Sequence, residues 1–354
     1  MNCKKIQEKL CENGLDAIIL FSPYNIRYAT GFNLQDGAVL VTKSDATLFT
    51  DSRYIELARE KVLDAAVVQF GAGQTLYECL DVAIAQSGSM KIGAEERNLS
   101  FGRWTELSER VGHTFIPAQH IMDELRAVKQ QYEVDSIVEA QRIAEKALEE
   151  VLGIIKPGIS EKEIAAELTY RMMLNGGEGN SFDPICITGK KTSLPHGEPG
   201  DDVVKMGDFV TMDFGCLKNG YCSDMTRTVA VGSATDEMKK IYDTVLRAQL
   251  AGIEKARAGV PGADIHNAAA KVIADAGYGE YFGHGFGHSL GLQIHEAPNA
   301  SPSNKDPMPC GAVISAEPGI YIPGRFGVRI EDMLYLTEDG NINLTKAPKK
   351  LIIL

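Results

Sequence analysis

One nine-residue pattern occurs twice in this chain, at a separation of 104 residues. Gly207–Gly215 and Gly311–Gly319 both begin with Gly, continue as an apolar run, and end with a carboxylate followed two residues later by Gly. A second pair of segments, Gly158–Ile164 and Gly259–Ile265, is separated by 101 residues. The repetition predicts two duplicated halves, each made of two helices followed by a β-hairpin region. Each half would deliver a carboxylate from the same strand position, so that carboxylates converge across a pseudo-twofold axis.

The residues before this repeat follow a different pattern, in which short apolar runs alternate with a helical segment. The expected strands are Leu15–Phe21, Gly37–Thr42, Ala46–Thr50 and Ala65–Phe70, and the expected helix is Ile55–Val62. Such alternation is typical of an α/β domain.

The pattern changes near residue 124, where we place a domain boundary. Beyond it, a long amphipathic helix is expected over Glu133–Ile155, and Ser160 and Glu163 form a capping box that opens a second helix through about Leu174. The length of 354 residues suits two domains. The predicted organisation is an α/β N-terminal domain over residues 1–123 and an α+β domain with the internal repeat over residues 124–354.

Composition narrows the classes of partner. The formal net charge of −12 repels phosphate backbones, so nucleic acid is not expected as a partner. No apolar run approaches the ~18 residues needed to span a bilayer, and the N-terminus lacks the apolar core of a signal peptide. The seven cysteines are scattered and include no CxxC pair, as expected of reduced thiols. A cytoplasmic protein without a membrane partner is the expectation.

Four carboxylates occupy matching places in the two halves. Asp224 follows Asp213 by 11 residues, and Glu331 follows Glu317 by 14 residues. If the intervening glycine-containing stretches form hairpins, the carboxylates of each pair lie on adjacent strands. Four carboxylates in one sheet would repel one another, and a pair of divalent cations would relieve that repulsion. The alternative from spacing alone is a set of surface acids at strand ends.

Histidines favour the metal hypothesis. His284, His288 and His295 lie in one glycine-rich stretch, which suits a closely packed polar site better than a helix or a core. One histidine with four carboxylates is an oxygen-rich ligand set that suits Mn, Co or Zn. His196 parallels His295, since each precedes the first carboxylate of its half. Two such histidines could stabilise an oxyanion or move a proton, although each taken alone is more often structural.

The residues beyond position 124 resemble the pita-bread metallopeptidases, a group that includes methionine aminopeptidase, aminopeptidase P and prolidase. The blocks that carry the resemblance are Thr211–Gly215, Ser223–Arg227, Gly283–Gly291, Ser315–Tyr321 and Arg329–Asp332. The first domain is similar to the creatinase N-terminal domain through Ser22–Phe32 and Thr50–Tyr54. The resemblance therefore covers essentially the whole chain and implies a pita-bread fold for the repeated part.

The resemblance also implies roles for individual residues. It implies two divalent metal ions, with Mn²⁺ favoured over Co²⁺ or Zn²⁺, which lower the pKa of water and so supply the nucleophile. Glu317 would also handle the proton of that water. The implied metal ligands are Asp213, Asp224, His288, Glu317 and Glu331, of which Asp224 and Glu331 bridge the ions.

Further residues are implied to act on the substrate. His284 and His295 would hold the substrate and the developing oxyanion, and His196 would assist from the opposite half. Tyr321 and Arg329 resemble groups on the substrate side, although an arginine beside buried carboxylates can also simply compensate charge.

The expected function is hydrolysis of Xaa-Pro peptide bonds by an Xaa-Pro aminopeptidase, acting on peptides with proline at the second position. The alternative within the family is prolidase, an Xaa-Pro dipeptidase, which shares the ligands. Two less favoured hypotheses are a non-catalytic peptide-binding module and a metal-free creatinase-type enzyme, because such relatives typically lose ligands that this chain keeps. The resemblance also implies a homodimer.

Overall fold

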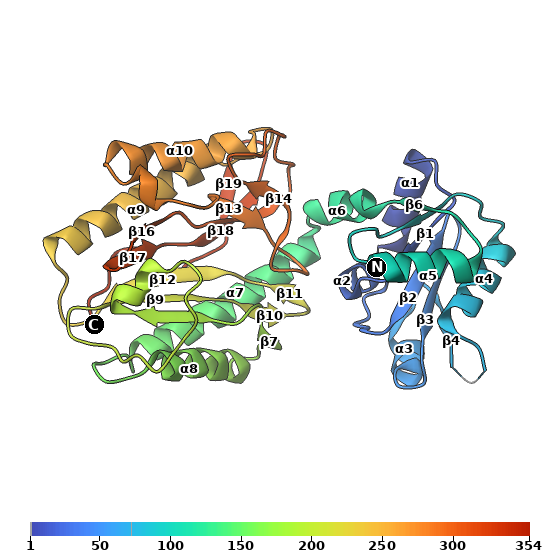
Figure 1. Cartoon of the computed structure of the whole chain (residues 1–354), viewed down its shortest axis with the longest axis horizontal. Coiled ribbons are helices and arrows are strands. Elements are labelled where there is room, and N and C mark those ends of the chain that lie inside the picture. The colour runs from blue at the N-terminus through green and yellow to red at the C-terminus, as the bar shows by residue number, and fades with distance from the viewer. Residues whose placement is uncertain (1, 72) are drawn as a thin grey trace. The chain divides into compact units, whose positions relative to one another are not determined.

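The computed structural model describes residues 2–71 and 73–354 (Figure 1). The chain divides into two compact units, one ending at Leu125 and the other beginning at Arg126. Each unit has its own buried apolar clusters.

The first unit contains a six-stranded mixed sheet with the order β4-β3-β2-β1-β5-β6. All residues of β1 and β2 are buried, which explains why the sequence of each strand is a nearly continuous apolar run. β2 and β3 have the predicted bounds, and the α/β class predicted for this region is confirmed. The strands are β1 (Ala17–Leu20), β2 (Gly37–Thr42), β3 (Ala46–Thr50), β4 (Ala66–Gln69), β5 (Ile92–Ala94) and β6 (Phe115–Pro117).

Helices accompany this sheet. Thr75 and Glu78 form a capping box at the start of α4, which fixes where that helix begins. The helices are α1 (Cys3–Glu12), α2 (Pro23–Thr30), α3 (Ile55–Lys61), α4 (Leu76–Ser87) and α5 (Phe101–Val111), and α6 (Gln119–Ala127) spans the boundary between the units.

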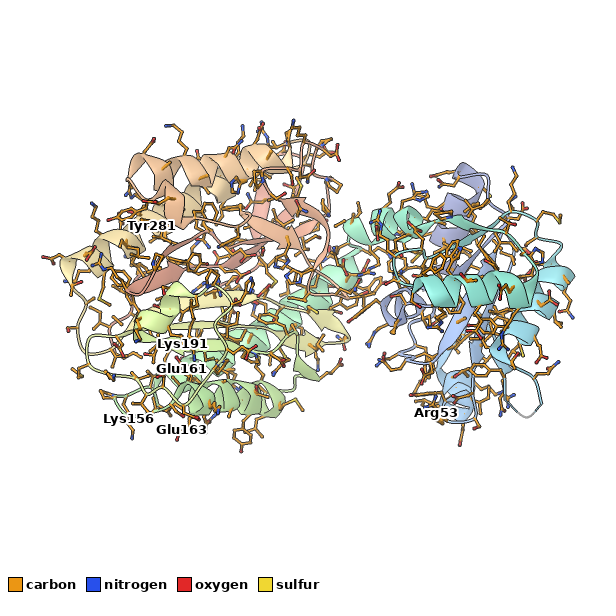
Figure 2. All side chains as sticks on the ribbon, viewed as in Figure 1. Arg53, Lys156, Glu161, Glu163, Lys191 and Tyr281 are labelled. Atoms are coloured by element: carbon orange, nitrogen blue, oxygen red, sulfur yellow. The ribbon has the colours of Figure 1, made fainter. Side chains whose placement is uncertain are left out.

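The second unit has two pairs of long helices. The Ser160–Glu163 capping box is confirmed: the backbone N–H of Glu163 donates to Ser160 Oγ at 3.2 Å, and that of Ser160 donates to the Glu163 carboxylate at 2.8 Å. The neighbouring Glu161 is buried and pairs with Lys191 of η1 at 2.6 Å, which ties the start of α8 to that turn (Figure 2). The helices are α7 (Gln131–Leu152), α8 (Glu161–Leu174), α9 (Asp236–Lys255) and α10 (Gly262–Asp275), with short 3₁₀ turns η1 (Gly189–Ser193) and η2 (Gly279–Tyr281).

The central strands of this unit form two sheets, one with the order β12-β9-β8 and the other with the order β14-β13-β15-β18-β19. These strands lie between α7 and α8 on one side and α9 and α10 on the other (Figure 1). The central strands are β8 (Ile185–Thr188), β9 (Phe209–Phe214), β12 (Met225–Ala230), β13 (Gly287–Ser289), β14 (Glu296–Ala300), β15 (Val313–Ala316), β18 (Asp332–Leu336) and β19 (Asn341–Asn343). Smaller sheets are formed by β7 (Gly179–Asn180), β10 (Cys216–Lys218) and β11 (Tyr221–Cys222), and by β16 (Gly319–Ile322) and β17 (Phe326–Arg329).

The two halves of this unit repeat each other in their hydrogen bonds. The backbone N–H of Gly158 donates to the Val204 carbonyl at 2.9 Å, and the N–H of Gly259 donates to the Met308 carbonyl at 2.8 Å. The first glycines of the repeated strand motif, Gly207 and Gly311, have φ values of 85° and 89°, a conformation that favours glycine. The predicted duplication is therefore present in the fold.

None of the helices in the described part of the chain combines the length and the apolar character needed to cross a membrane. All seven cysteines are free, and five of them are buried.

Candidate active site

The four carboxylates of the repeat come from equivalent strand ends. β9 and β12 pair antiparallel, with Asp213 near the end of β9 and Asp224 directly before β12. β15 and β18 also pair antiparallel, with Glu317 directly after β15 and Glu331 directly before β18. The prediction that the carboxylates of each pair lie on adjacent strands is confirmed. All four line one cavity of about 500 Å³.

Hydrogen bonds from strand residues fix the positions of Glu331 and Glu317. The backbone N–H of Glu331 donates to the Thr226 carbonyl at 3.1 Å, and the Thr226 hydroxyl donates to the Glu331 carboxylate at 2.7 Å. The Ser315 hydroxyl donates to Glu317 at 3.0 Å. Both hydroxyls belong to strands of the central sheets, so the carboxylates are held by rigid elements.

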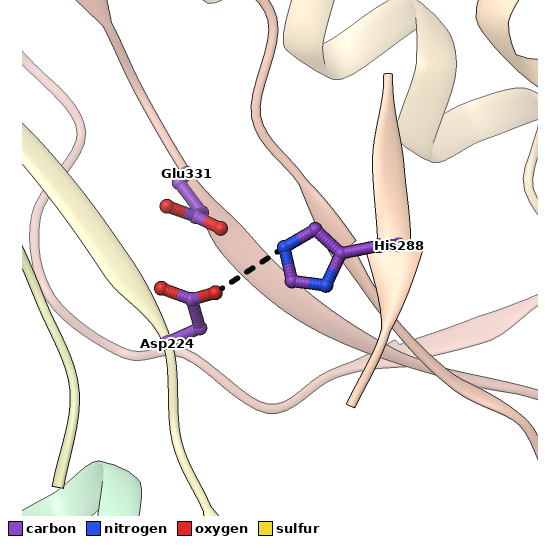
Figure 3. Close-up of side chains that lie close together, drawn as sticks. All are labelled: Asp224, His288 and Glu331. Atoms are coloured by element: carbon purple, nitrogen blue, oxygen red, sulfur yellow. Dashed lines mark ion pairs between the residues drawn. The ribbon is translucent and has the colours of Figure 1, made fainter. Parts of the chain in front are cut away.

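His288, on β13, faces this cluster. Its Nε2 atom lies 3.3 Å from Glu317 and 3.5 Å from Asp224. Its Nδ1 atom lies 3.2 Å from the carbonyl of Ser289, which makes Nδ1 the donor and leaves the Nε2 lone pair directed at the carboxylates. Single ligand atoms of Asp224, His288 and Glu331 all lie within 4.8 Å of one another (Figure 3).

The electrostatics of the cluster are unfavourable without a cation. Burial raises the pKa of Asp224, and the charges of Asp213 and Glu317 raise it further. Burial also raises the pKa of Glu317 and of Glu331, and neighbouring carboxylates of the cluster add to both shifts. Arg329 is the compensating charge, since its guanidinium lies 2.6 Å from Asp213.

Three carboxylate oxygens of the cluster have no hydrogen-bond partner among residues 2–71 and 73–354. These buried atoms are Asp213 Oδ1, Asp224 Oδ1 and Glu331 Oε1. A buried acceptor without a partner costs roughly 1–3 kcal/mol, so such atoms call for an explanation. Unpaired carboxylate oxygens beside an imidazole lone pair are a donor set that fits divalent cations.

His284, Tyr321 and Arg329 form a hydrogen-bonded chain beside the carboxylates. His284 Nδ1 lies 2.8 Å from the Gly285 carbonyl and must donate to it. Burial lowers the pKa of His284 below 6.5, so the neutral ring accepts at Nε2 from the Tyr321 hydroxyl, 3.0 Å away. Arg329 donates to that hydroxyl at 2.9 Å, and burial raises the pKa of Tyr321 to about 12, so the phenol keeps its proton.

The remaining two predicted histidines line the same cavity. The ring centroid of His295 lies 4.3 Å from that of His288, and burial lowers the pKa of His295 below 6.5. His196 lies on the loop after η1 and is close enough to contribute electrostatically to both His284 and His295. The structure thus gathers all the predicted site residues around one cavity, with Tyr321 in contact through His284 and Arg329.

Several residues that shape the cavity carry no signal in the sequence. Apolar side chains form part of its wall, and two polar residues of the wall come from β14 and the loop that follows it. These residues are Phe182, Ile185, Pro195, Ile294, Asn299 and Ser301. They lie in loops or on the short strands β8 and β14, so only the folded chain shows that they meet.

Comparison with known families and structures covers both units. The model of metallopeptidase family M24 matches residues 135–338, and that of the creatinase/prolidase N-terminal domain matches residues 3–128. An Xaa-Pro dipeptidase of Pyrococcus horikoshii is 36% identical over 99% of this chain and 98% of its own length.

Two solved structures have the same fold. An Xaa-Pro dipeptidase from Bacillus anthracis superposes with a TM-score of 0.96 at 39% identity, covering 100% of this chain and 99% of its own. An X-Pro aminopeptidase from Thermotoga maritima superposes with a TM-score of 0.92 at 35% identity, covering 98% of this chain and 99% of its own.

Proposed function

Because the chain belongs to metallopeptidase family M24 and carries a creatinase/prolidase N-terminal domain, we propose that it hydrolyses Xaa-Pro peptide bonds, with Xaa-Pro dipeptides as its main substrates. The observation that carries the proposal is the convergence of four carboxylates and His288 on one cavity, with three buried carboxylate oxygens that find no partner in the described part of the chain. The family implies divalent metal ions, and this donor set fits them.

The proposed metal ligands are the residues inferred from the sequence. Asp213, Asp224, His288, Glu317 and Glu331 would hold two divalent ions, for which Mn²⁺ is the favoured choice because the set is rich in hard oxygen ligands. When bound, such ions polarise the scissile carbonyl and make a water-derived nucleophile available at neutral pH.

The chain's own side chains supply the remaining steps. Glu317 is the proposed proton acceptor, since its carboxylate lines the cavity beside the other proposed ligands. His295 and His196 line the cavity, and no hydrogen bond to either ring comes from the described residues, so both rings can bind polar atoms of the substrate. Neutral His284 is held by Tyr321 and Gly285 and orients that wall of the site.

Proline selectivity has a physical basis in the cavity. A prolyl amide has no N–H to donate, and its ring fixes the backbone, so it needs a site that binds through shape. Phe182, Ile185, Pro195 and Ile294 provide an apolar wall that suits the pyrrolidine ring. We propose that this wall is the binding site of the substrate's proline ring.

The dipeptidase function is preferred over the aminopeptidase because relatives matching nearly the full chain are named Xaa-Pro dipeptidase. One observation keeps the aminopeptidase as a second candidate. Arg329 is the only Lys or Arg among the described residues lining the cavity, and it is paired with Asp213. A dipeptide presents a free carboxylate that needs a partner in the site, whereas a longer peptide does not.

The test compares an Xaa-Pro dipeptide with an Xaa-Pro-Yaa tripeptide, using the full chain loaded with Mn²⁺. Cleavage of the dipeptide with a higher kcat/KM supports the proposal, and cleavage of the tripeptide alone assigns the aminopeptidase function. Asp224→Ala is the control variant. Retained hydrolysis in this variant would refute the assignment of the metal site, and absence of hydrolysis by the wild-type chain would refute the function itself.

A further inference from the structure

A buried ion cluster lies behind the histidines of the active site. The Glu296 carboxylate is only 4% exposed and pairs with both Arg126 and Lys129, whose side chains are 6% and 1% exposed. Burial acts to raise the pKa of Glu296, but the two cations hold it at about 2. Removing one partner of a buried pair is strongly destabilising, so this cluster fixes its members in place.

Lys129 links the ion cluster to the strand that carries the proposed metal ligand His288. Its Nζ atom donates to Glu296 and to the Ser289 hydroxyl, each at 3.1 Å. Ser289 in turn donates to the Val313 carbonyl at 2.8 Å and directly follows His288 in β13. Lys129 therefore holds the end of the strand that carries His288.

Arg126 links the ion cluster to the turn that carries His295, a proposed substrate-binding residue. It donates to the Gln293 side-chain carbonyl at 2.7 Å and to Glu296. The backbone N–H of Gln293 also donates to Glu296, at 2.9 Å, which closes the turn that contains His295. Arg126 therefore holds the segment from Gln293 to Glu296, in which His295 faces the cavity.

The packing around the cluster leaves little room for adjustment. A Cβ atom added to Gly291 would lie 2.9 Å from the Glu296 carboxylate and 3.1 Å from Lys129 Cε. The Gly291 carbonyl is also fixed, because it accepts from the backbone N–H of Cys222 at 2.7 Å. Small displacements of Arg126 or Lys129 would therefore reach the loop between His288 and His295.

We propose that Lys129 and Arg126 are positioning residues for two different histidines of the active site. Lys129 positions the metal ligand His288 through Ser289. Arg126 positions the substrate-binding His295 through Gln293 and Glu296. The inference rests on the proposed function, which gives His288 and His295 their separate roles. A cluster with a merely structural role would stabilise the fold without this division.

The experiment distinguishes two branches, the one from Lys129 to His288 and the one from Arg126 to His295. It measures Mn²⁺ binding by calorimetry and hydrolysis of an Xaa-Pro dipeptide by steady-state kinetics, on the full chain. Lys129→Met should weaken Mn²⁺ binding by about 10- to 100-fold, as loss of groups that orient a metal ligand commonly does. Arg126→Met should keep Mn²⁺ affinity close to that of the wild type but lower kcat/KM by about tenfold or more.

Two milder variants keep the buried ion pairs intact and carry the test if the first pair fails to fold. Ser289→Ala removes the link to Lys129 together with the bond from Ser289 to the Val313 carbonyl, and should weaken Mn²⁺ binding. Gln293→Met removes only the neutral link to Arg126 and should lower kcat/KM without a change in Mn²⁺ affinity. Lys271→Met, which removes an exposed lysine paired with Asp275, is the matched control and should change neither quantity.

Three outcomes overturn the proposal or its premise, and they are distinguishable. Wild-type Mn²⁺ affinity and kcat/KM in all four variants, with only a lowered melting temperature, would show that the cluster merely stabilises the fold. Equal loss of Mn²⁺ affinity in both branches would refute the division between His288 and His295. Failure of the wild-type chain to bind Mn²⁺ or to cleave the dipeptide would instead refute the proposed function.

Discussion

Asp224 is the residue at which stability and the proposed function conflict most directly. Burial and the charges of Asp213 and Glu317 raise its pKa, and its Oδ1 atom has no partner among the described residues. The ionised side chain therefore destabilises the metal-free protein at neutral pH. A divalent cation would reverse this effect by neutralising the charge and binding the unpaired oxygen.

Asp224→Asn is expected to raise the melting temperature of the metal-free chain at neutral pH, because the neutral amide removes the repulsion. Each kcal/mol gained should appear as about 2–4 °C for a unit of this size. The same variant should lose most of the stabilisation that Mn²⁺ gives to the wild type, and differential scanning calorimetry with and without Mn²⁺ measures both effects. Asp275→Asn, at an exposed ion pair with Lys271, is the matched control. A lower melting temperature for metal-free Asp224→Asn would contradict the account of the cluster.

Tyr321 supports the site through a single hydroxyl, which accepts from Arg329 and donates to His284. Tyr321→Phe should lower kcat/KM by about 10- to 100-fold, because His284 loses one of the two hydrogen bonds that orient its ring. Steady-state kinetics on an Xaa-Pro dipeptide measures the loss. Tyr242→Phe is the matched control: the Tyr242 hydroxyl is also in a hydrogen bond, to the Lys349 carbonyl outside the cavity, and its loss should affect stability alone. Equal kinetic losses in the two variants would remove the special role of Tyr321.

Residue types and spacings predict that four acids of the candidate site converge, since Asp213, Asp224, Glu317 and Glu331 repeat between the halves. The partner of Arg329 cannot be found in this way. Arg329 binds Asp213, which is 116 residues distant and belongs to the opposite half. A contact of this kind depends on how the two sheets meet, and no local pattern encodes it.

At the scale of elements, the close approach of β13 to β15 positions His288. A Cβ atom added to Gly287 would lie 1.9 Å from the Ser315 carbonyl oxygen, a distance that requires the backbone to move. Gly287→Ala should therefore destabilise the chain by roughly 1–3 kcal/mol, as overpacking of a core does. The variant should also weaken Mn²⁺ binding, because the shift displaces His288, and thermal unfolding together with calorimetric titration of Mn²⁺ measures both effects.

Gly283→Ala is the control within the same glycine-rich stretch. Apart from its chain neighbours, no described residue has an atom within 4 Å of a Cβ added to Gly283, so this substitution should leave both stability and metal affinity nearly unchanged. If the two variants behave alike, the glycines of this stretch serve chain flexibility rather than the close packing of β13.

Elements with strong local signals are predictable from the sequence. The apolar runs Gly37–Thr42 and Ala46–Thr50 are strands with those bounds, and the Ser160 capping box starts α8.

The parallel between His196 and His295 extends less far than the sequence suggests. Glu296, next to His295, is buried with two cations, whereas Glu198, two residues after His196, is exposed. The difference arises because Arg126 and Lys129 pair with Glu296, whereas Glu198 has no ion pair among the described residues.

At the scale of the whole molecule, the duplicated halves explain why the acidic residues that matter most lie in the interior. The formal net charge is −12, and four of the acids behind it face one cavity, where two divalent cations would bring the total to about −8. Metal binding should therefore govern the stability of the folded chain as well as its activity.

The pH dependence of that stability follows from the direction of the pKa shifts. The pKa values of Asp224 and Glu331 in the folded chain lie above their ordinary values of 3.8 and 4.5. Between the ordinary and the raised pKa, the folded chain binds protons that the unfolded chain releases. The stability of the metal-free chain is therefore fully present on the acid side and falls as the pH rises through the raised values. Glu296, with its pKa of about 2, stays ionised throughout this range and does not alter the trend.

Metal binding responds to pH in the opposite direction, because Mn²⁺ must displace the same protons from Asp224 and Glu331. The increase in melting temperature that Mn²⁺ causes should thus be small at mildly acidic pH and should grow toward mildly alkaline pH, while chelation should abolish both the increase and the hydrolysis of Xaa-Pro substrates. Calorimetric scans across this range, with Mn²⁺ and with a chelator, measure the effect. An Asp224→Asn, Glu331→Gln double variant should show no such growth, since it has lost the groups that exchange protons for metal. A wild-type increment that is the same at both ends of the range would mean that Mn²⁺ stabilises the chain at some site other than these carboxylates.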